Sequence, residues 1–374
     1  MPERSGRKWV RQQSVRVNLA LLITAVRENR QAICKAPRMV INSFPFRSIL
    51  VPLDGSALAE QATPLACHIA QRSGGKLRLA LVHQPPTPPL DVAVAELFTS
   101  LELTTRKSER GYLRAMQGRL RESGTRLSSA VTLTGAAGPG PALAQYIREM
   151  GIDLVVMATH GRGGIRRAWL GSVADYLIRN LAVPVLLVRP EENGRASDRA
   201  ARAGGILVPL DGSPLAEEAL DPAGALARVF DAELTLVQMV RPVLLATSSA
   251  FPYPSSYDEE LTELCRAQAQ DYLDDVVEQM QSRGIRASGA ARVAWTAADA
   301  ILDLARPERV ALVALATHGR GGVRRLVLGS VADKVVRGAD VPVLVYHPTG
   351  RGKRSRTSRR IRSGRSRSTQ ESRR

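Results

Sequence analysis

Hydrophobic residues along this chain form short continuous runs, separated by longer stretches in which they recur three or four positions apart. Residues 48–53 and 154–158 are continuous runs without polar alternation, which is typical of parallel strands covered on both faces. Residues 57–71 have helical spacing, and the glycine pair Gly74 and Gly75 then predicts the end of a helix. The two patterns alternate, which predicts strands and helices in turn.

The pattern predicts two sets of five strands. In the first half we expect strands at 48–53, 77–83, 127–133, 154–158 and 183–188, helices at 57–71, 96–122, 142–149 and 172–180, and a proline-rich loop at 84–95. In the second half we expect strands near 205–210, 233–239, 287–294, 310–316 and 341–346. Strands alternating with helices imply right-handed crossovers. The predicted fold is therefore α/β, with two tandem doubly wound domains, each a five-stranded parallel sheet with helices on both faces.

Two internal repeats support this division. Residues 49–56 (ILVPLDGS) return unchanged at 206–213, and residues 158–175 return at 316–333 with three substitutions. The offsets, 157 and 158 residues, are nearly equal, so two domains of one design follow each other. The predicted organisation is a basic N-terminal extension (1–46), a first domain (47–190), a polar linker (191–203), a second domain (204–348) and a basic tail (349–374).

Prolines mark the fifth predicted strand of each repeat. Pro184 and Pro342 lack the N–H that a central strand needs, which places these strands at sheet edges. Two exposed edges of nearly identical sequence in one chain can pair with each other. We therefore predict an intramolecular pseudo-twofold pair of repeats, with a homodimer as a further assembly.

The positive charge lies outside the repeats. Residues 1–48 carry ten Lys or Arg and two Glu, and residues 349–374 carry eleven Lys or Arg and one Glu. Because the whole chain has 53 basic and 35 acidic residues, 32 of each remain between these segments, which leaves the repeats without net charge. The tail has a single apolar residue and cannot fold alone. Two interpretations of these basic segments stay open: they bind weakly to nucleic acid or an anionic surface, or they are inert.

Cysteine usage and hydropathy bear on location. Cys34, Cys67 and Cys265 are scattered without metal-ligand or disulfide spacing, which fits a reducing compartment. The apolar run 19–26 is far shorter than the roughly 20 residues that span a bilayer. It follows basic residues, as in a signal peptide, but no cleavage site is evident. We predict no transmembrane segment and a cytoplasmic location. For residues 1–38, the alternative interpretation is that the natural chain starts at Met39.

Glycine-rich segments follow the fourth predicted strand of each repeat. In an open α/β sheet, ligands bind beyond the carboxyl ends of the strands, where Asp54, Asp211 and these segments fall. Backbone N–H groups of a glycine-rich loop and a helix start can hold a phosphate. The competing interpretation is structural: Ser172 and Ser330 each precede an acidic residue by three positions, as in a helix capping box, and the glycines could serve turns alone.

Both repeats resemble the universal stress protein domain, and specifically its ATP-binding branch. That branch has a Gly-x2-Gly-x9-Gly-(Ser/Thr) signature after the fourth strand and an Asp after the first. The segments Gly161-x9-Gly171-Ser172 and Gly319-x9-Gly329-Ser330 match the later part, and Asp54 and Asp211 match the acidic position. The resemblance covers about 300 residues. It implies an adenine nucleotide alpha hydrolase-like fold, ATP as ligand, with or without Mg²⁺, and an Asp beside the adenosine.

The sequence departs from the signature at several positions. Ala158 and Ala316 replace its leading glycine. In the second repeat Thr296 corresponds to Gly138, and Ala311 corresponds to Asp153. Gln238-Met239 corresponds to His83-Gln84, a position at which the backbone of family members faces the adenine. The two sites are therefore expected to differ in affinity. We assign nucleotide binding to Pro52, Asp54, Gln84, Ala158, His160, Gly161, Arg162, Gly164, Gly171, Ser172, Pro209, Asp211, Met239, Ala316, His318, Gly319, Arg320, Gly322, Gly329 and Ser330.

Other chemistry finds little support in the sequence. A Walker phosphate loop and a Gly-x-Ser-x-Gly elbow are both absent. His160 and His318 have no second ligand at workable spacing, which favours loop hydrogen bonds over metal. The sequence therefore predicts a nucleotide-binding stress or signalling module without catalytic residues. A slow ATPase or self-phosphorylating enzyme, in which Asp54 or Asp211 helps to hold Mg²⁺, is the alternative.

Overall fold

The computed structural model describes residues 46–85, 92–159, 170–190, 204–246, 254–306, 310–317 and 328–347. The predictions made for the basic N-terminal extension, the linker and the C-terminal tail lie outside these residues. Among the helices in the described part, none is long and apolar enough to cross a membrane.

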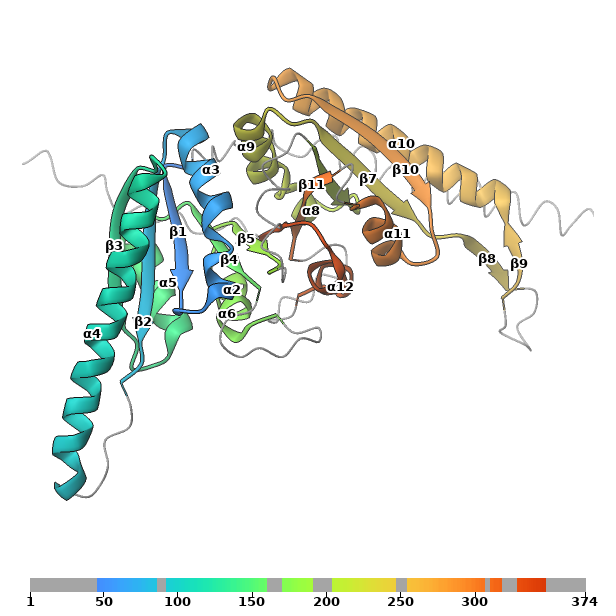
Figure 1. Cartoon of the computed structure of the whole chain (residues 1–374). Coiled ribbons are helices and arrows are strands. Elements are labelled where there is room, and N and C mark those ends of the chain that lie inside the picture. Colours follow the sequence, from blue (N-terminus) through green and yellow to red (C-terminus); the bar gives the residue numbers. More distant parts are fainter. Residues whose placement is uncertain are drawn as a thin grey trace, which may run out of the picture. The chain divides into compact units, whose positions relative to one another are not determined.

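The first repeat alternates strands and helices along the chain (Figure 1). Its elements are β1 (Ser48–Leu53), α2 (Ala57–Glu60), α3 (Thr63–Ser73), β2 (Lys76–His83), α4 (Val92–Glu122), β3 (Leu127–Thr134), α5 (Pro139–Glu149), β4 (Leu154–Ala158), α6 (Ser172–Asn180) and β5 (Val185–Val188).

The second repeat follows the same order, with one addition. Its elements are β6 (Gly205–Leu210), α8 (Pro214–Glu217), α9 (Leu220–Phe230), β7 (Leu234–Val240), β8 (Val243–Ala246), β9 (Pro254–Asp258), α10 (Glu259–Ser282), β10 (Ala287–Val293), α11 (Ala297–Leu304), β11 (Val310–Ala316), α12 (Ser330–Gly338) and β12 (Val343–Tyr346). The antiparallel pair β8–β9 has no counterpart among the predicted elements.

Each repeat forms a five-stranded parallel sheet, as predicted. The strand orders are β3-β2-β1-β4-β5 and β10-β7-β6-β11-β12, so the order reverses between the first and fourth strands of each repeat. In this arrangement the loops after β1 and β4, and those after β6 and β11, leave the same edge of the sheet side by side.

The fifth strands join the two sheets. β5 pairs antiparallel with β12, and Leu186 lies opposite Leu344. Pro184 and Pro342 directly precede these strands instead of lying within them, and their carbonyls accept hydrogen bonds from Val155 and Val313. The missing proline N–H therefore falls outside the ladder that links the repeats.

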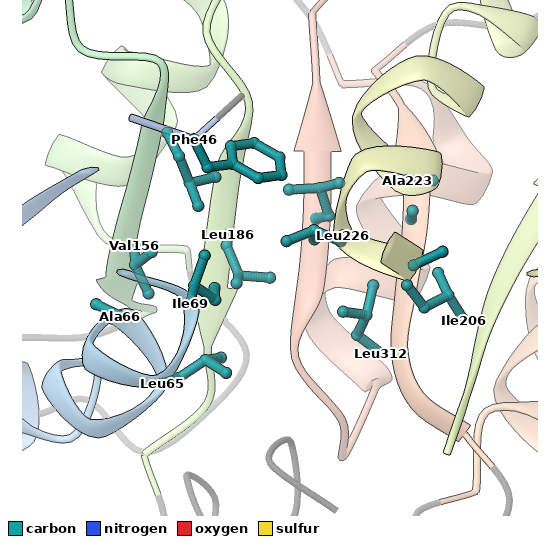
Figure 2. Close-up of a cluster of buried hydrophobic side chains, with 14 of the residues drawn as sticks. Phe46, Leu65, Ala66, Ile69, Val156, Leu186, Ile206, Ala223, Leu226 and Leu312 are labelled. Carbon is teal, nitrogen blue, oxygen red and sulfur yellow. The ribbon is translucent and has the colours of Figure 1, made fainter. Parts of the chain in front are cut away.

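The buried core has one cluster on each face of the sheet. Figure 2 shows part of the first cluster, in which Phe46, Ile69 and Leu186 lie in the same group as Leu226 and Leu312 of the second repeat. Burial of a large aliphatic side chain stabilises the fold by about 1.5–3 kcal/mol.

Several predicted boundaries moved for local reasons. The helix expected at 57–71 is divided between α2 and α3, and Pro64 lies in the first turn of the second piece. Proline lacks an N–H and is favoured in a first turn, so it begins a new helix there. α5 begins at Pro139 for the same reason, and Gly138 before it has a φ of 98°.

Candidate functional site

The site is built where the carboxyl ends of neighbouring strands meet. In the first repeat Asp54 follows β1, and Thr159 follows β4, which pairs with β1. The chain returns from the glycine-rich loop at Gly171 and enters α6. The second repeat places Asp211, Thr317 and Gly329 in the same relation to β6, β11 and α12.

Each aspartate is held by the turn that follows it. Asp54 Oδ1 accepts hydrogen bonds from the Ser56 N–H at 2.9 Å and the Ser56 hydroxyl at 2.6 Å. Ser56 Oγ in turn accepts from the Ala59 N–H and caps α2. In the second repeat the hydroxyl of Ser213 donates to Asp211 Oδ1 at the same 2.6 Å. The turn therefore fixes the orientation of both carboxylates before any ligand binds.

Glycine at the start of α6 and α12 allows a close backbone contact. The Gly171 N–H donates to the Thr159 carbonyl at 2.9 Å, and the Gly329 N–H donates to the Thr317 carbonyl at 2.8 Å. A Cβ on Gly171 would lie 3.0 Å from the Thr159 oxygen, and one on Gly329 would lie 3.2 Å from the Thr317 oxygen. Both glycines have negative φ, so close approach and not a left-handed backbone requires them.

The capping-box interpretation of Ser172 and Ser330 is wrong. The N-cap residues are Gly171 and Gly329, and neither helix start has a side-chain cap. Both serines are exposed at the first helical position. Asp175 instead forms an ion pair with Arg179, and Asp333 forms one with Arg337. The first N–H groups of α6 and α12 therefore have no side-chain cap, and they lie at the end of the helix where an anion is favoured.

Eight of the twenty predicted site residues fall outside the part of the chain that the structure describes. The glycine-rich loops lie outside the described residues, and with them His160, Gly161, Arg162, Gly164, His318, Gly319, Arg320 and Gly322. The structure describes both ends of each loop: Ala158 and Ala316 close the strands before it, and the two glycine–threonine contacts pin its return.

The register of the second strands, β2 and β7, changes one predicted correspondence between the repeats. Leu81 pairs with Leu53 and Gln238 pairs with Leu210, so Gln238 corresponds to Leu81. Met239 therefore corresponds to Val82 and packs, like it, against the second core cluster. The predicted correspondence of Gln238-Met239 with His83-Gln84 is wrong by two residues. Gln84 itself is exposed immediately after β2. Pro52 is buried within β1, and its counterpart Pro209 is half-buried in β6.

A buried ionisable pair at the end of β2 was not predicted. His83 is 1% exposed, and its Nδ1 lies 3.0 Å from Glu109 Oε2 on α4. Its Nε2 lies 3.8 Å from Glu102 Oε1, and it has no hydrogen-bond partner among the described residues. Because the second repeat has Val240 at this position, the pair belongs to the first repeat alone.

A tyrosine and a glutamate lie beside the aspartate of the second repeat. The Tyr272 hydroxyl donates to Glu217 Oε1 at 3.0 Å. Burial raises the pKa of Glu217, the hydrogen bond from Tyr272 opposes this shift, and the charge of Asp211 adds to it. The first repeat has Tyr112 and Glu60 at matching positions, and burial together with Glu60 and Asp54 raises the pKa of Tyr112. The described residues contain no group of three His, Cys, Asp or Glu side chains able to hold a metal alone.

Comparison with known proteins defines the family. The model described as "Universal stress protein family" matches residues 45–189 and 204–347. A universal stress protein of Mycobacterium tuberculosis is 28% identical over 315 residues, which cover 79% of this chain and 94% of that protein. One from Methanocaldococcus jannaschii is 30% identical over 140 residues, 37% of this chain and 79% of that protein.

Solved structures agree with this assignment at the level of the fold. The crystal structure of a universal stress protein from Archaeoglobus fulgidus has a TM-score of 0.56 and 17% identity, and covers 81% of this chain and 98% of that chain. The chain belongs to the universal stress protein family, with two family domains in tandem.

Proposed function

We propose that each repeat binds an adenine nucleotide, with ATP as its main ligand, and that the protein acts in the cytoplasm as a stress-response or signalling module. The observation that carries the proposal is the pair of features present in both repeats: a carboxylate held by its own turn, and a helix start without a side-chain cap that a glycine pins to the preceding strand.

The two features suit the two ends of the ligand. The N-terminus of α6 offers N–H groups and the positive end of the helix dipole to phosphates, and Asp54 is an acceptor for the adenosine hydroxyls. The dipole contributes only about 0.3–1 kcal/mol. A dissociation constant near ~1 μM corresponds to about −8 kcal/mol, so the loop N–H groups and burial of the base must supply most of the affinity.

The residues are suited to a nucleotide-bound Mg²⁺ better than to a resident metal. Asp54 and Asp211 each offer one carboxylate, which faces the adenosine in this proposal, so a Mg²⁺ ion would be held by the nucleotide phosphates and water. The ion would offset phosphate charge. The glycine and helix N–H groups would position the phosphates, and the aspartate would orient the nucleotide.

We expect the first repeat to bind more tightly. After β7 the second repeat continues through Arg241 and Pro242 into the β8–β9 pair, whereas the first repeat ends β2 with the buried His83–Glu109 contact. This contact anchors the chain directly before Gln84, at the end of the strand beside β1. A pre-organised segment loses less conformational entropy when a ligand binds.

Calorimetry with ATP and with ADP, each with and without Mg²⁺, tests the proposal. We expect saturable binding at two sites of unequal affinity and no multiple-turnover phosphate release. No binding of either nucleotide would overturn it. Binding followed by catalytic release of phosphate, or transfer of phosphate to the protein, would favour the ATPase or self-phosphorylating alternative instead.

A further inference from the structure

The outer edges of the two end strands of the combined sheet have different neighbouring side chains. β3 and β10 are the last strands in the sheet order, and no strand of the described residues pairs with their outer edges. In Figure 1, α4 runs along β3 and α10 runs along β10. An edge strand presents N–H and C=O groups that can pair with a further strand.

The edge of the second repeat is closed by a side chain. Gln270 Nε2 donates to the Gly289 carbonyl at 3.1 Å, and Gln270 Oε1 accepts from the Ala291 N–H at 2.9 Å. One amide group thus takes the place of a neighbouring strand. A Cβ on Gly289 would lie 3.1 Å from atoms of Leu273 and Val277, so the glycine allows this close approach of α10.

The first repeat has different residues at the same place. Ala130 and Thr132 lie opposite Leu79 and Leu81 of β2, as Gly289 and Ala291 lie opposite Leu236 and Gln238 of β7. Arg110 lies 14 residues before Gly124, the glycine that follows α4, and Gln270 lies 14 residues before Gly284, the glycine that follows α10. Arg110 and Gln270 therefore occupy equivalent positions on the two helices. Arginine has donors and no acceptor, so it cannot accept the Thr132 N–H as Gln270 accepts that of Ala291.

A cationic cavity lies at this edge. It has a volume of about 300 Å³ and is lined by Arg106, Arg110, Arg114, Gln117, Ala130 and Thr132, among others. Arg106 is paired with Glu102 at 3.0 Å. The described residues provide no ion pair for Arg110 or Arg114, so two cationic groups and a strand edge face one cavity.

We propose that this edge binds an extended acidic segment of another protein, which adds to β3 as a strand. A carbonyl of the segment accepts the Thr132 N–H, and one of its N–H groups donates to the Ala130 carbonyl. Alternate side chains of a strand are about 6.8 Å apart. Arg110 and Arg114, four residues apart on a helix, are separated by about 6 Å along its axis. Two carboxylates at alternate positions of the segment therefore match the two arginines.

The charge of the chain excludes its own extensions as occupants. The segments before residue 49 and after residue 348 are strongly basic and are repelled by Arg110 and Arg114. A small anion would satisfy the arginines and leave the Ala130 carbonyl without a donor. An acidic strand meets both the charge and the backbone groups.

Fluorescence anisotropy with the full-length protein tests the proposal. The probe is a labelled peptide of alternating glutamate and valine. One control peptide has lysine in place of glutamate, and a second keeps its glutamates but has proline at alternate positions, which removes the N–H donors. We expect the first peptide to bind and both controls to bind at least about tenfold more weakly. Equal binding of the proline peptide, or displacement of the first peptide by millimolar phosphate at constant ionic strength, would overturn the strand model.

Matched variants locate the site. The Arg110→Gln variant places at the β3 edge an amide equivalent to that of Gln270, which covers the β10 edge. We expect this variant to weaken peptide binding about tenfold or more. Arg121→Gln removes the same charge from the exposed last turn of α4, outside the residues that line the cavity, and we expect little change. Equal losses in the two variants would overturn the proposal. ATP binding should be unchanged in both, which distinguishes this site from the nucleotide sites and confirms folding.

Discussion

The two repeats share one site design and differ around it. The aspartate turn and the glycine–threonine contact are reproduced with hydrogen-bond lengths that agree within 0.1 Å. The edge strands, the ends of the second strands and the contacts before the fourth strands differ. Under the proposed function, the common parts are those that would contact the phosphates and the adenosine, and the differing parts are those available for separate tasks. Variants made in matched pairs test this division.

The largest expected effect is at the aspartates. Asp54→Ala removes the carboxylate from the first site together with the acceptor for Ser56. A hydrogen bond to a charged group contributes about 1.5–3 kcal/mol, which corresponds to a tenfold to hundredfold loss of affinity. Calorimetry should show this loss for the tighter site, and Asp211→Ala should affect only the weaker one. A loss shared equally by both sites in either variant would contradict the independence of the repeats.

Much of this comparison could be predicted from the sequence. The repeated residues Asp54 and Asp211 directly follow continuous strands, so their place beyond the carboxyl ends of those strands followed from the strand pattern alone. The break at Pro64 was missed because helical periodicity continues through it, although the proline marks a helix start. The β8–β9 pair could not be predicted, because the inserted strands are short. The His83–Glu109 contact joins residues 26 positions apart, and such a contact depends on how α4 packs against β2.

The sequence also could not decide the role of the helix-start serines. Ser172 fits a capping box by spacing, but a cap must adopt an extended backbone directly before the helix. The structure gives that place to Gly171, because its N–H reaches the Thr159 carbonyl.

The next effect concerns the start of β1. Asp153 accepts the N–H groups of Arg47 and Ser48 at 2.7 and 3.0 Å, and the second repeat has Ala311 packed against Gly204 instead. We expect Asp153→Ala to lower the free energy of unfolding by about 1–2 kcal/mol, because two N–H groups lose their acceptor.

Urea denaturation measures this change. Asp175→Ala is the control, because it removes a helix-surface ion pair worth about 0.3–0.5 kcal/mol. If the two variants are destabilised equally, the Asp153 contacts do not stabilise the first repeat.

A similar but smaller effect is expected at the sheet edges. Gln270→Leu leaves the Gly289 carbonyl and the Ala291 N–H without their amide partner, which should cost about 1 kcal/mol. Arg110→Leu, at the matching position of the first repeat, should change stability by less than about 0.5 kcal/mol. Hydrogen exchange of the Ala291 amide should become faster in Gln270→Leu. Unchanged exchange would mean that Gln270 does not close the edge.

The smallest effect is a change in pH dependence. Because burial raises the pKa of Glu217 above its ordinary value of 4.5, its contribution to stability is greatest below pH 4.5 and is lost as the pH rises through the raised value. Glu217→Gln keeps an acceptor for Tyr272 and cannot ionise. Relative to the wild type, the variant should therefore gain stability as the pH rises from 4 to 7. Urea titrations over this range would contradict the account if the difference between the two proteins stayed constant.

Nucleotide stoichiometry in Gly171→Val tests the central claim most directly. A side chain at this position would meet the Thr159 carbonyl oxygen, since a Cβ there lies 3.0 Å from it, and would displace the start of α6. Calorimetry with ATP should give two sites in the wild type, only the weaker site in Gly171→Val and only the tighter site in Gly329→Val. Two undisturbed sites in Gly171→Val, with its fold intact by circular dichroism, would contradict the assignment of the helix start as the phosphate site.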